Sequence, residues 1–135
     1  MKKFLMLFVL TIVLGSCNND YYETKWEVVY LDVKSSDWKI SRDDQGLNAY
    51  YYCTFNVPQV TKYVCDNGNV QAYYQSGQVQ QVLPYVRHYE NNEGALWTQT
   101  VDYDYSPGAI NVYVTNSDFY EETPPAMKFR VVIMW

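Results

Sequence analysis

The chain has 135 residues, of which 48% are hydrophobic and 18% aromatic, and its formal net charge is -5. This length fits one domain with a buried core of its own. The acidic balance and the lack of a Lys/Arg cluster exclude nucleic acid as an expected partner, because such a surface repels the phosphate backbone.

The first sixteen residues have the layout of a secretory signal peptide. Two lysines give a positive start, an apolar run extends over residues 4–14, and two small residues follow. About eleven apolar residues would cover roughly half of the hydrocarbon core of a bilayer, which is too short for a permanent transmembrane helix. We therefore expect residues 1–16 to direct export and to be removed.

The tetrad Leu14-Gly15-Ser16-Cys17 resembles the lipobox of bacterial lipoproteins. In that family the cysteine thiol receives a diacylglyceryl group, cleavage makes the cysteine the first residue, and its amine is usually acylated too. The resemblance implies that Cys17 is a lipid anchor and that residues 17–24 are the lipidated N-terminus and tether. Two or three acyl chains hold a protein stably on a bilayer. The alternative is an ordinary signal peptide with an incidental cysteine.

The residues behind Cys17 bear on the destination. In well-studied Gram-negative bacteria, Asp after the anchor implies retention in the inner membrane, so Asn18 favours the outer membrane. Asp20 and Glu23 weakly resemble the acidic signals that send some lipoproteins to the cell surface. We expect an outer-membrane lipoprotein, with the cell surface preferred over the periplasmic face.

Two cysteines remain in the mature chain, Cys53 and Cys65. Export leads to an oxidising compartment, where a disulfide between them would stabilise the fold by roughly 3 kcal/mol on the chain-entropy model. As an alternative, both stay free and pack as small hydrophobes. Their spacing matches no redox motif, so a catalytic cysteine is not expected.

Short strands are predicted from Lys25 onward. Residues 26–33 alternate and indicate a strand with one buried face. The run NAYYYCTFNV, residues 48–57, is the densest. Its alternation directs one set of side chains to the core, namely Tyr51, Cys53, Phe55 and Val57.

The one candidate helix lies between Pro58 and Gly68. It has one or two turns, and Thr61 is placed to cap its N-terminus.

A hairpin is expected next. Residues 70–75 form its first strand, Ser76-Gly77 gives the tight turn, and residues 79–86 return. Pro84 interrupts the return strand and places it at an edge or a bulge.

The remaining strands are expected over residues 95–105 and 110–115, and the closing run FRVVIMW is apolar on both faces apart from Arg130. The closing run suits an interior strand covered on each side. Seven or eight strands at a spacing of about ten residues predict an all-β antiparallel β-sandwich of immunoglobulin-like type over residues 25–135, with at most one short helix. A barrel is the alternative.

Few residues suggest a catalytic or metal-binding site. A single histidine, His88, excludes a multi-histidine metal site, and we expect a partly exposed strand residue beside Arg87 and Glu90. Asp102 and Asp104 share a strand face and could act as a carboxylate pair or bind Ca²⁺, or simply form a solvated polar face. Other acids lie in loops and could also supply Ca²⁺ ligands: Asp43, Asp44, Asp118, Glu121 and Glu122.

Aromatic residues outside the predicted core are the feature most suggestive of recognition. Rings of this kind stack on the apolar C–H faces of sugars, while Asn, Gln and Asp bind the hydroxyl groups. The candidates are Tyr50, Tyr52, Tyr73, Tyr89, Trp97, Tyr113 and Tyr120. Packing between strands is the alternative role for the same rings.

The mature chain also resembles a group of small bacterial envelope lipoproteins with a compact β domain. The stretches concerned are VKSSDWK, LPYVRHYE, LWTQTVDYDYSPG, VTNSDF and MKFRVVIMW. The group carries no assigned activity, so the resemblance implies no catalytic residue.

Together these patterns predict a lipid-anchored envelope protein with a non-catalytic binding or adhesion domain for a glycan or protein ligand. The alternative is a periplasm-facing structural or accessory lipoprotein that binds another envelope protein. Apart from the acyl groups on Cys17, no cofactor and no metal are expected. A hydrolase is the third possibility and would need carboxylates that converge in a pocket.

Overall fold

The computed structural model describes residues 23–135, so the predicted signal peptide and the anchor at Cys17 lie outside the described residues. The described chain forms nine strands, one short α-helix and one 3₁₀ turn. The elements are β1 (Trp26–Val33), η1 (Ser35–Asp37), β2 (Lys39–Arg42), β3 (Ala49–Asn56), α2 (Lys62–Asn67), β4 (Asn69–Ser76), β5 (Val79–Val82), β6 (Tyr85–Glu90), β7 (Leu96–Ser106), β8 (Ala109–Asn116) and β9 (Met127–Met134).

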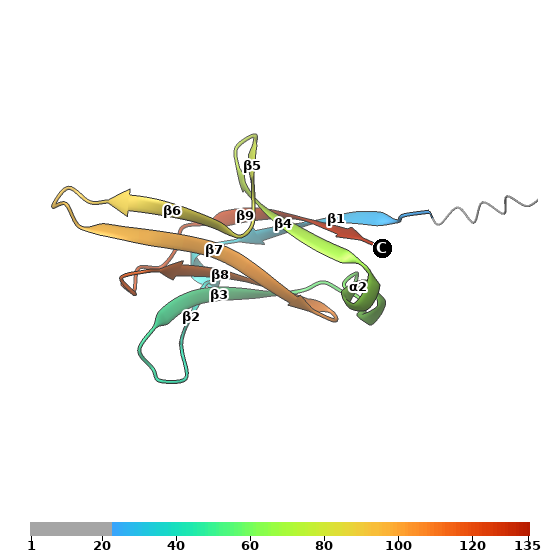
Figure 1. Ribbon diagram of the computed structural model, residues 1–135, viewed down its shortest axis with the longest axis horizontal. Helices are drawn as coiled ribbons and strands as arrows, with labels where there is room; N and C mark the ends of the chain where they lie inside the picture. Colours follow the sequence, from blue (N-terminus) through green and yellow to red (C-terminus); the bar gives the residue numbers. More distant parts are fainter. Residues whose placement is uncertain (1–22) are drawn as a thin grey trace, which may run out of the picture.

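The strands form two antiparallel sheets that face each other (Figure 1). One sheet has the order β1-β9-β4-β5 and the other β2-β3-β8-β7-β6. The predicted all-β antiparallel sandwich is therefore confirmed. The first strand pairs with the last one, which differs from the ABED and CFG strand order of immunoglobulin constant domains.

The core lies between the sheets and is built from alternate residues of each strand. Phe129, Val131 and Ile133 of β9 have no exposed surface, and they meet equally buried side chains of the opposite sheet, such as Ile110 and Val112 of β8. Burying one such side chain contributes about 1.5–3 kcal/mol. The predicted inward set on β3 is confirmed, with Phe55 half-buried at the end of the row.

The strand count exceeds the prediction by at least one because the expected return strand over residues 79–86 is two strands. β5 pairs with β4 in the first sheet, whereas β6 pairs with β7 in the second. Pro84 lies between them, where the chain passes from one sheet to the other. The proline ends the first pairing because it has no N–H for the ladder.

The expectation that the closing strand is covered on each side is wrong for one of its faces. β9 is interior in hydrogen bonding, since it lies between β1 and β4. Its second face, which carries Arg130 and Val132, is half-exposed because no further layer formed by residues 23–135 covers this sheet.

The predicted helix is confirmed as α2. The Thr61 hydroxyl accepts a hydrogen bond of 3.2 Å from the Val64 amide, which satisfies a donor of the first turn. The chain leaves the helix at Gly68, whose amide donates to the Val64 carbonyl at 2.8 Å.

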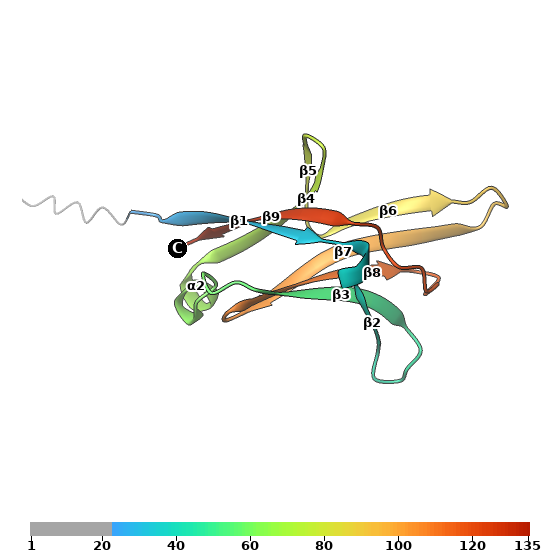
Figure 2. The same ribbon diagram turned by 180° about the vertical axis from the view of Figure 1, so that it is seen from behind.

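The two ends of the sandwich differ. At one end lie the start of β1, the C-terminus and α2, where Lys25 and Trp135 exchange backbone hydrogen bonds of 2.8 and 2.9 Å. At the other end β6 and β7 extend past the first sheet as a two-stranded arm (Figure 2). This arm leaves part of an inward-facing sheet surface uncovered.

Candidate functional site

The arm supplies the floor of a groove between the two sheets. Register pairs Tyr89 with Trp97, Arg87 with Gln99, and Tyr85 with Val101 across β6 and β7. Val101 is fully buried and faces the core, so the period of two directs the paired side chains to the same inner face. Because the first sheet ends before it reaches the arm, the side chains on this face beyond Val101 line an open surface.

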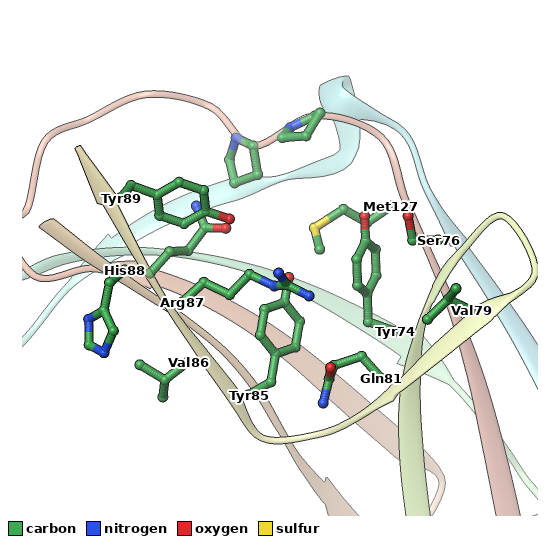
Figure 3. Close-up of a pocket in the computed structure, with 13 residues that line it drawn as sticks. Tyr74, Ser76, Val79, Gln81, Tyr85, Val86, Arg87, His88, Tyr89 and Met127 are labelled. Carbon is green, nitrogen blue, oxygen red and sulfur yellow. The ribbon is translucent and has the colours of Figure 1, made fainter. Parts of the chain in front are cut away.

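The opposite wall comes from the first sheet and from the loop before β9. Tyr74 of β4, Met127 of β9 and the loop residues Pro124 and Pro125 enclose a pocket of about 690 Å³ with the arm. Figure 3 shows the Tyr74 and Tyr85 side chains side by side in this pocket, and their ring centroids are 5.8 Å apart at 28°. We call this pocket and its continuation along the arm the arm groove.

Arg87 lies in the middle of the arm groove (Figure 3). Its guanidinium carbon is 5.6 Å from the centroid of the Tyr85 ring, within the range of a cation–π interaction. Burial raises the pKa of the Tyr85 phenol, although the Arg87 charge acts in the opposite direction. The phenol is therefore neutral at physiological pH and can donate a hydrogen bond.

The groove continues toward the tip of the arm. Tyr89 and Trp97 stack with centroids 5.4 Å apart and an interplanar angle of 16°. They line a hollow of about 270 Å³ that shares Gln99 and the two prolines with the larger pocket. A third hollow, of about 390 Å³, shares Trp97 and adds Leu96 and Tyr120. The three adjoining hollows form one aromatic-lined path.

A second group of the predicted residues lies on the outer face of the five-stranded sheet. In this register Tyr52 faces Tyr113 and Tyr113 faces Asp102. The Tyr50 ring meets Tyr113 edge-on with centroids 6.0 Å apart. With Asp104 these residues form what we call the outer-face patch, which contains an open depression of about 310 Å³.

Hydrogen bonds distinguish the two carboxylates of the patch. Asp104 accepts bonds from Asn111 Nδ2 at 2.6 Å and from the Tyr113 hydroxyl at 2.7 Å. Burial and the bond to Asp104 raise the pKa of Tyr113 to about 12. No hydrogen bond to the Asp102 carboxylate is found among residues 23–135, and burial followed by the Asp104 charge raises its pKa.

This carboxylate pair does not resemble the arrangement of a glycosidase. Asp102 and Asp104 project from one strand into one open face, whereas glycosidases place their carboxyl groups on either side of the scissile bond. The patch has the groups of a polar contact surface: three tyrosine rings, two carboxylates and Thr115.

The predicted aromatic residues are thus divided among separate places. Tyr50, Tyr52 and Tyr113 lie in the outer-face patch, and Trp97 with Tyr89 and Tyr120 lies along the arm groove. Tyr73 belongs to neither site. It lies on the outer face of the other sheet beneath Arg130, whose guanidinium carbon is 5.4 Å from the ring centroid.

Three residues of the arm groove were not predicted from the sequence, namely Arg87, Tyr74 and Tyr85. A signal was present in PYVRHYE, where the alternation places Tyr85, Arg87 and Tyr89 on one face. His88 lies on the other face of β6, is exposed, and its Nδ1 is 2.9 Å from Thr98 Oγ1.

The other candidate side chains, the two cysteines and the loop carboxylates, either bond to nearby residues or remain apart from one another. Cys53 is a buried free thiol and Cys65 a half-buried one. Asp43 accepts a 2.8 Å bond from the Leu47 amide and so closes its own loop, while Glu121 pairs with Arg42. Within residues 23–135 no group of three metal-ligating side chains comes together.

No protein-family model, curated protein or solved structure matches the chain. Function is therefore inferred from the groove and the patch themselves. In the part of the chain that the structure covers, neither helical segment has the length and apolarity to span a bilayer. The lipid anchor at Cys17 and the resemblance to envelope lipoproteins stay predictions.

Proposed function

We propose that this protein is a non-catalytic carbohydrate-binding lipoprotein of the bacterial cell envelope, held on the outer membrane through acyl groups on Cys17. The observation that carries the proposal is the arm groove, an open path lined by the stacked pairs Tyr74–Tyr85 and Tyr89–Trp97. Binding sites are typically concave, mostly apolar, and equipped with a few polar groups that fix orientation.

The chemistry of the groove suits a chain of sugar rings. The aromatic faces offer apolar surface to the C–H face of a pyranose, and the amides of Gln81 and Gln99 can both donate to and accept from hydroxyl groups. The groove is open along the arm, so an oligosaccharide can pass through it rather than end in it. This openness favours a polymer over a small metabolite.

The position of the groove supports a binding surface that faces away from the membrane. β1 begins at the end of the sandwich opposite to the arm (Figure 1). A tether over residues 18–24 would reach at most about 25 Å from the anchor. With Cys17 in the bilayer, the N-terminal end of the domain would lie nearest the membrane and the arm would project outward.

A protein partner is the second candidate function. Leu96 at the start of β7 is 75% exposed, Tyr120 in the loop after β8 is 69% exposed, and both line the outermost hollow. Exposed apolar side chains that cluster in this way mark protein interaction sites as well as ligand grooves. In this form the protein would be a periplasm-facing accessory lipoprotein bound to another envelope protein.

Protease treatment of intact cells tests the location. We expect loss of the domain from intact cells while a known periplasmic protein stays protected. Protection until the outer membrane is broken would refute the surface location and favour the periplasmic partner, which cross-linking would then identify. As a control for the anchor, Cys17→Ala should abolish lipid labelling and leave the precursor uncleaved; a normally anchored variant would refute the lipobox prediction.

The purified lipidated protein in detergent tests the binding function. Its Trp fluorescence is recorded against a panel of oligosaccharides, because Trp97 lies in the groove. We expect a saturable change that Tyr89→Ala removes. Tyr30→Ala, which alters an exposed ring on β1, should leave binding unchanged. No response to any saccharide would refute the carbohydrate function.

A further inference from the structure

We infer that the arm groove selects saccharides that carry a carboxylate, and that Arg87 is the residue that binds this carboxylate. The inference rests on the proposed carbohydrate function and adds a ligand class to it. It follows from the contacts of Arg87, from the charges around the groove, and from the arrangement of the rings.

The Arg87 guanidinium is held in place but keeps its donors free. Its carbon lies 5.6 Å from the Tyr85 ring centroid, and Tyr85 is itself fixed against Tyr74. Among residues 23–135 no carboxylate lies within 4 Å of this guanidinium, and no side chain or carbonyl accepts a hydrogen bond from it. Its planar edge of N–H groups therefore remains available for a bidentate bond to a carboxylate.

The distribution of charges in the protein makes Arg87 the group that would bind an acidic ligand. The mature chain has eight basic and fifteen acidic side chains, for a formal charge of -7, so it repels anions at long range. Arg87 is the one Lys or Arg side chain among the described residues that line the three hollows, and the acidic Asp118 and Glu122 line only the two outer ones. Affinity for an acidic ligand would thus come from one local ion pair, and binding would depend only weakly on salt.

The rings on either side of Arg87 define how the saccharide would lie. Tyr85 and Tyr89 flank Arg87 on β6, since residues two apart share a face. A carboxylated sugar at Arg87 would thus have aromatic surface on both sides for its neighbours. Gln99, directly opposite Arg87 on β7, can bind a hydroxyl or the second carboxylate oxygen.

An acidic peptide is the competing ligand. β6 is an edge strand whose second side pairs with none of the described strands, so an extended peptide could add to it. The aromatic pairs favour the saccharide, because they supply flat apolar faces on the inner surface rather than along the hydrogen-bonding edge.

The test uses the purified lipidated protein in detergent and matched pairs of probes. Oligogalacturonides, oligoglucuronides and sialyllactose are each compared with their methyl esters or carboxyl-reduced forms by calorimetry, and a hexaglutamate peptide is included. For at least one pair we expect the acid to bind at least tenfold more tightly than its neutral form. Arg87→Gln should reduce this ratio to less than threefold, and Arg87→Lys should restore part of it.

Arg130→Gln is the matched control. Arg130 also lies over a tyrosine ring, Tyr73, but on the outer face of the other sheet, so its loss should leave the ratio unchanged. Equal binding of acidic and neutral saccharides, or a ratio that survives Arg87→Gln, would overturn this inference and leave the carbohydrate function intact. Binding of the peptide alone, or of no probe, would overturn the carbohydrate function as well.

Discussion

The hydroxyl of Tyr103 on β7 donates a hydrogen bond of 2.7 Å to the carbonyl oxygen of Val70 on β4, and so joins the two sheets through a side chain. Burial raises the pKa of this phenol, which keeps it protonated and able to donate. The bond lies between the two sheets near the start of β4, which follows directly after α2. It helps to hold the two sheets together at the end of the sandwich opposite to the arm.

Tyr103→Phe should lower the free energy of unfolding by about 1 kcal/mol, because it removes the donor and leaves a half-buried carbonyl without its partner. Urea denaturation measures the loss. Tyr105→Phe is the control: its ring stacks with Tyr103 at 6.5 Å, and its hydroxyl donates no hydrogen bond to residues 23–135. An equal effect of the two substitutions would show that the bond to Val70 contributes nothing specific.

Truncation of the β9 core should be far more costly. Phe129→Ala should destabilise the fold by about 3–5 kcal/mol, and Ile133→Val by about 0.5–1.5 kcal/mol, because both side chains have no exposed surface. The milder variant keeps the prediction measurable by urea denaturation if the first does not fold. Leu47→Ala, at a loop residue that is 69% exposed, should change stability by less than about 0.5 kcal/mol.

Asp102→Asn should stabilise the protein at neutral pH. Burial and the Asp104 charge raise the pKa of Asp102 above 3.8, so the folded state binds this proton more tightly than the unfolded chain. The contribution of this group to stability therefore falls as pH rises from about 3.8 through the raised pKa, and is constant above it. We expect the variant to melt up to about 4 °C higher at pH 7.

The gain from Asp102→Asn should fade as the pH falls below about 3.8, because the wild-type carboxyl then becomes protonated in both states. Thermal melts across this pH range check whether Asp102→Asn raises the melting temperature at neutral pH and loses this effect in acid. Asp32→Asn, at an exposed residue of β1, controls for the general loss of one negative charge. A lower melting temperature of Asp102→Asn at pH 7 would contradict the prediction and indicate a favourable contact of the carboxylate.

The two cysteines of the described chain should both titrate as free thiols. Unfolded, lipidated protein should react with two equivalents of a thiol reagent without prior reduction. In the folded protein Cys65 should react before Cys53, because burial hides the Cys53 thiol and raises its pKa, which lowers its thiolate fraction. If no thiol reacts until a reductant is added, the pair is a disulfide.

Arg87→Gln should change the stability of the fold by less than about 1 kcal/mol, because the residue is exposed and its observed partner is the face of Tyr85. The urea midpoint of the variant, compared with that of wild type, measures this. A large loss of stability would show that Arg87 supports the fold, and would argue against a residue kept free for a ligand.

The sequence predicted the direction of many side chains correctly because strand alternation is a local property. It identified the buried row of β3 and the cap of α2 at Thr61. It also placed Asp102 and Asp104 on the face opposite Val101, as observed. These assignments need only the alternation of side chains along a strand, or the residue types that cap the first turn of a helix.

Other features depended on which strands become neighbours, and alternation carries no such information. The run over residues 79–86 fits one strand as well as two, until the pairing shows β5 and β6 in different sheets. The apolar second face of β9 suggested a covering layer, but the sandwich has only two layers.

The sequence by itself therefore determined the class of fold, the inward rows and the short helix, and it selected most of the rings that line the arm groove and the outer-face patch. Only the tertiary structure decided where those rings meet. Trp97 and Tyr89 point inward by the same alternation as Val101, yet they stay accessible because the opposite sheet ends before it reaches them. The arm groove exists because two sheets of unequal reach pack together, and a strand pattern does not encode the length of the surface that will face it.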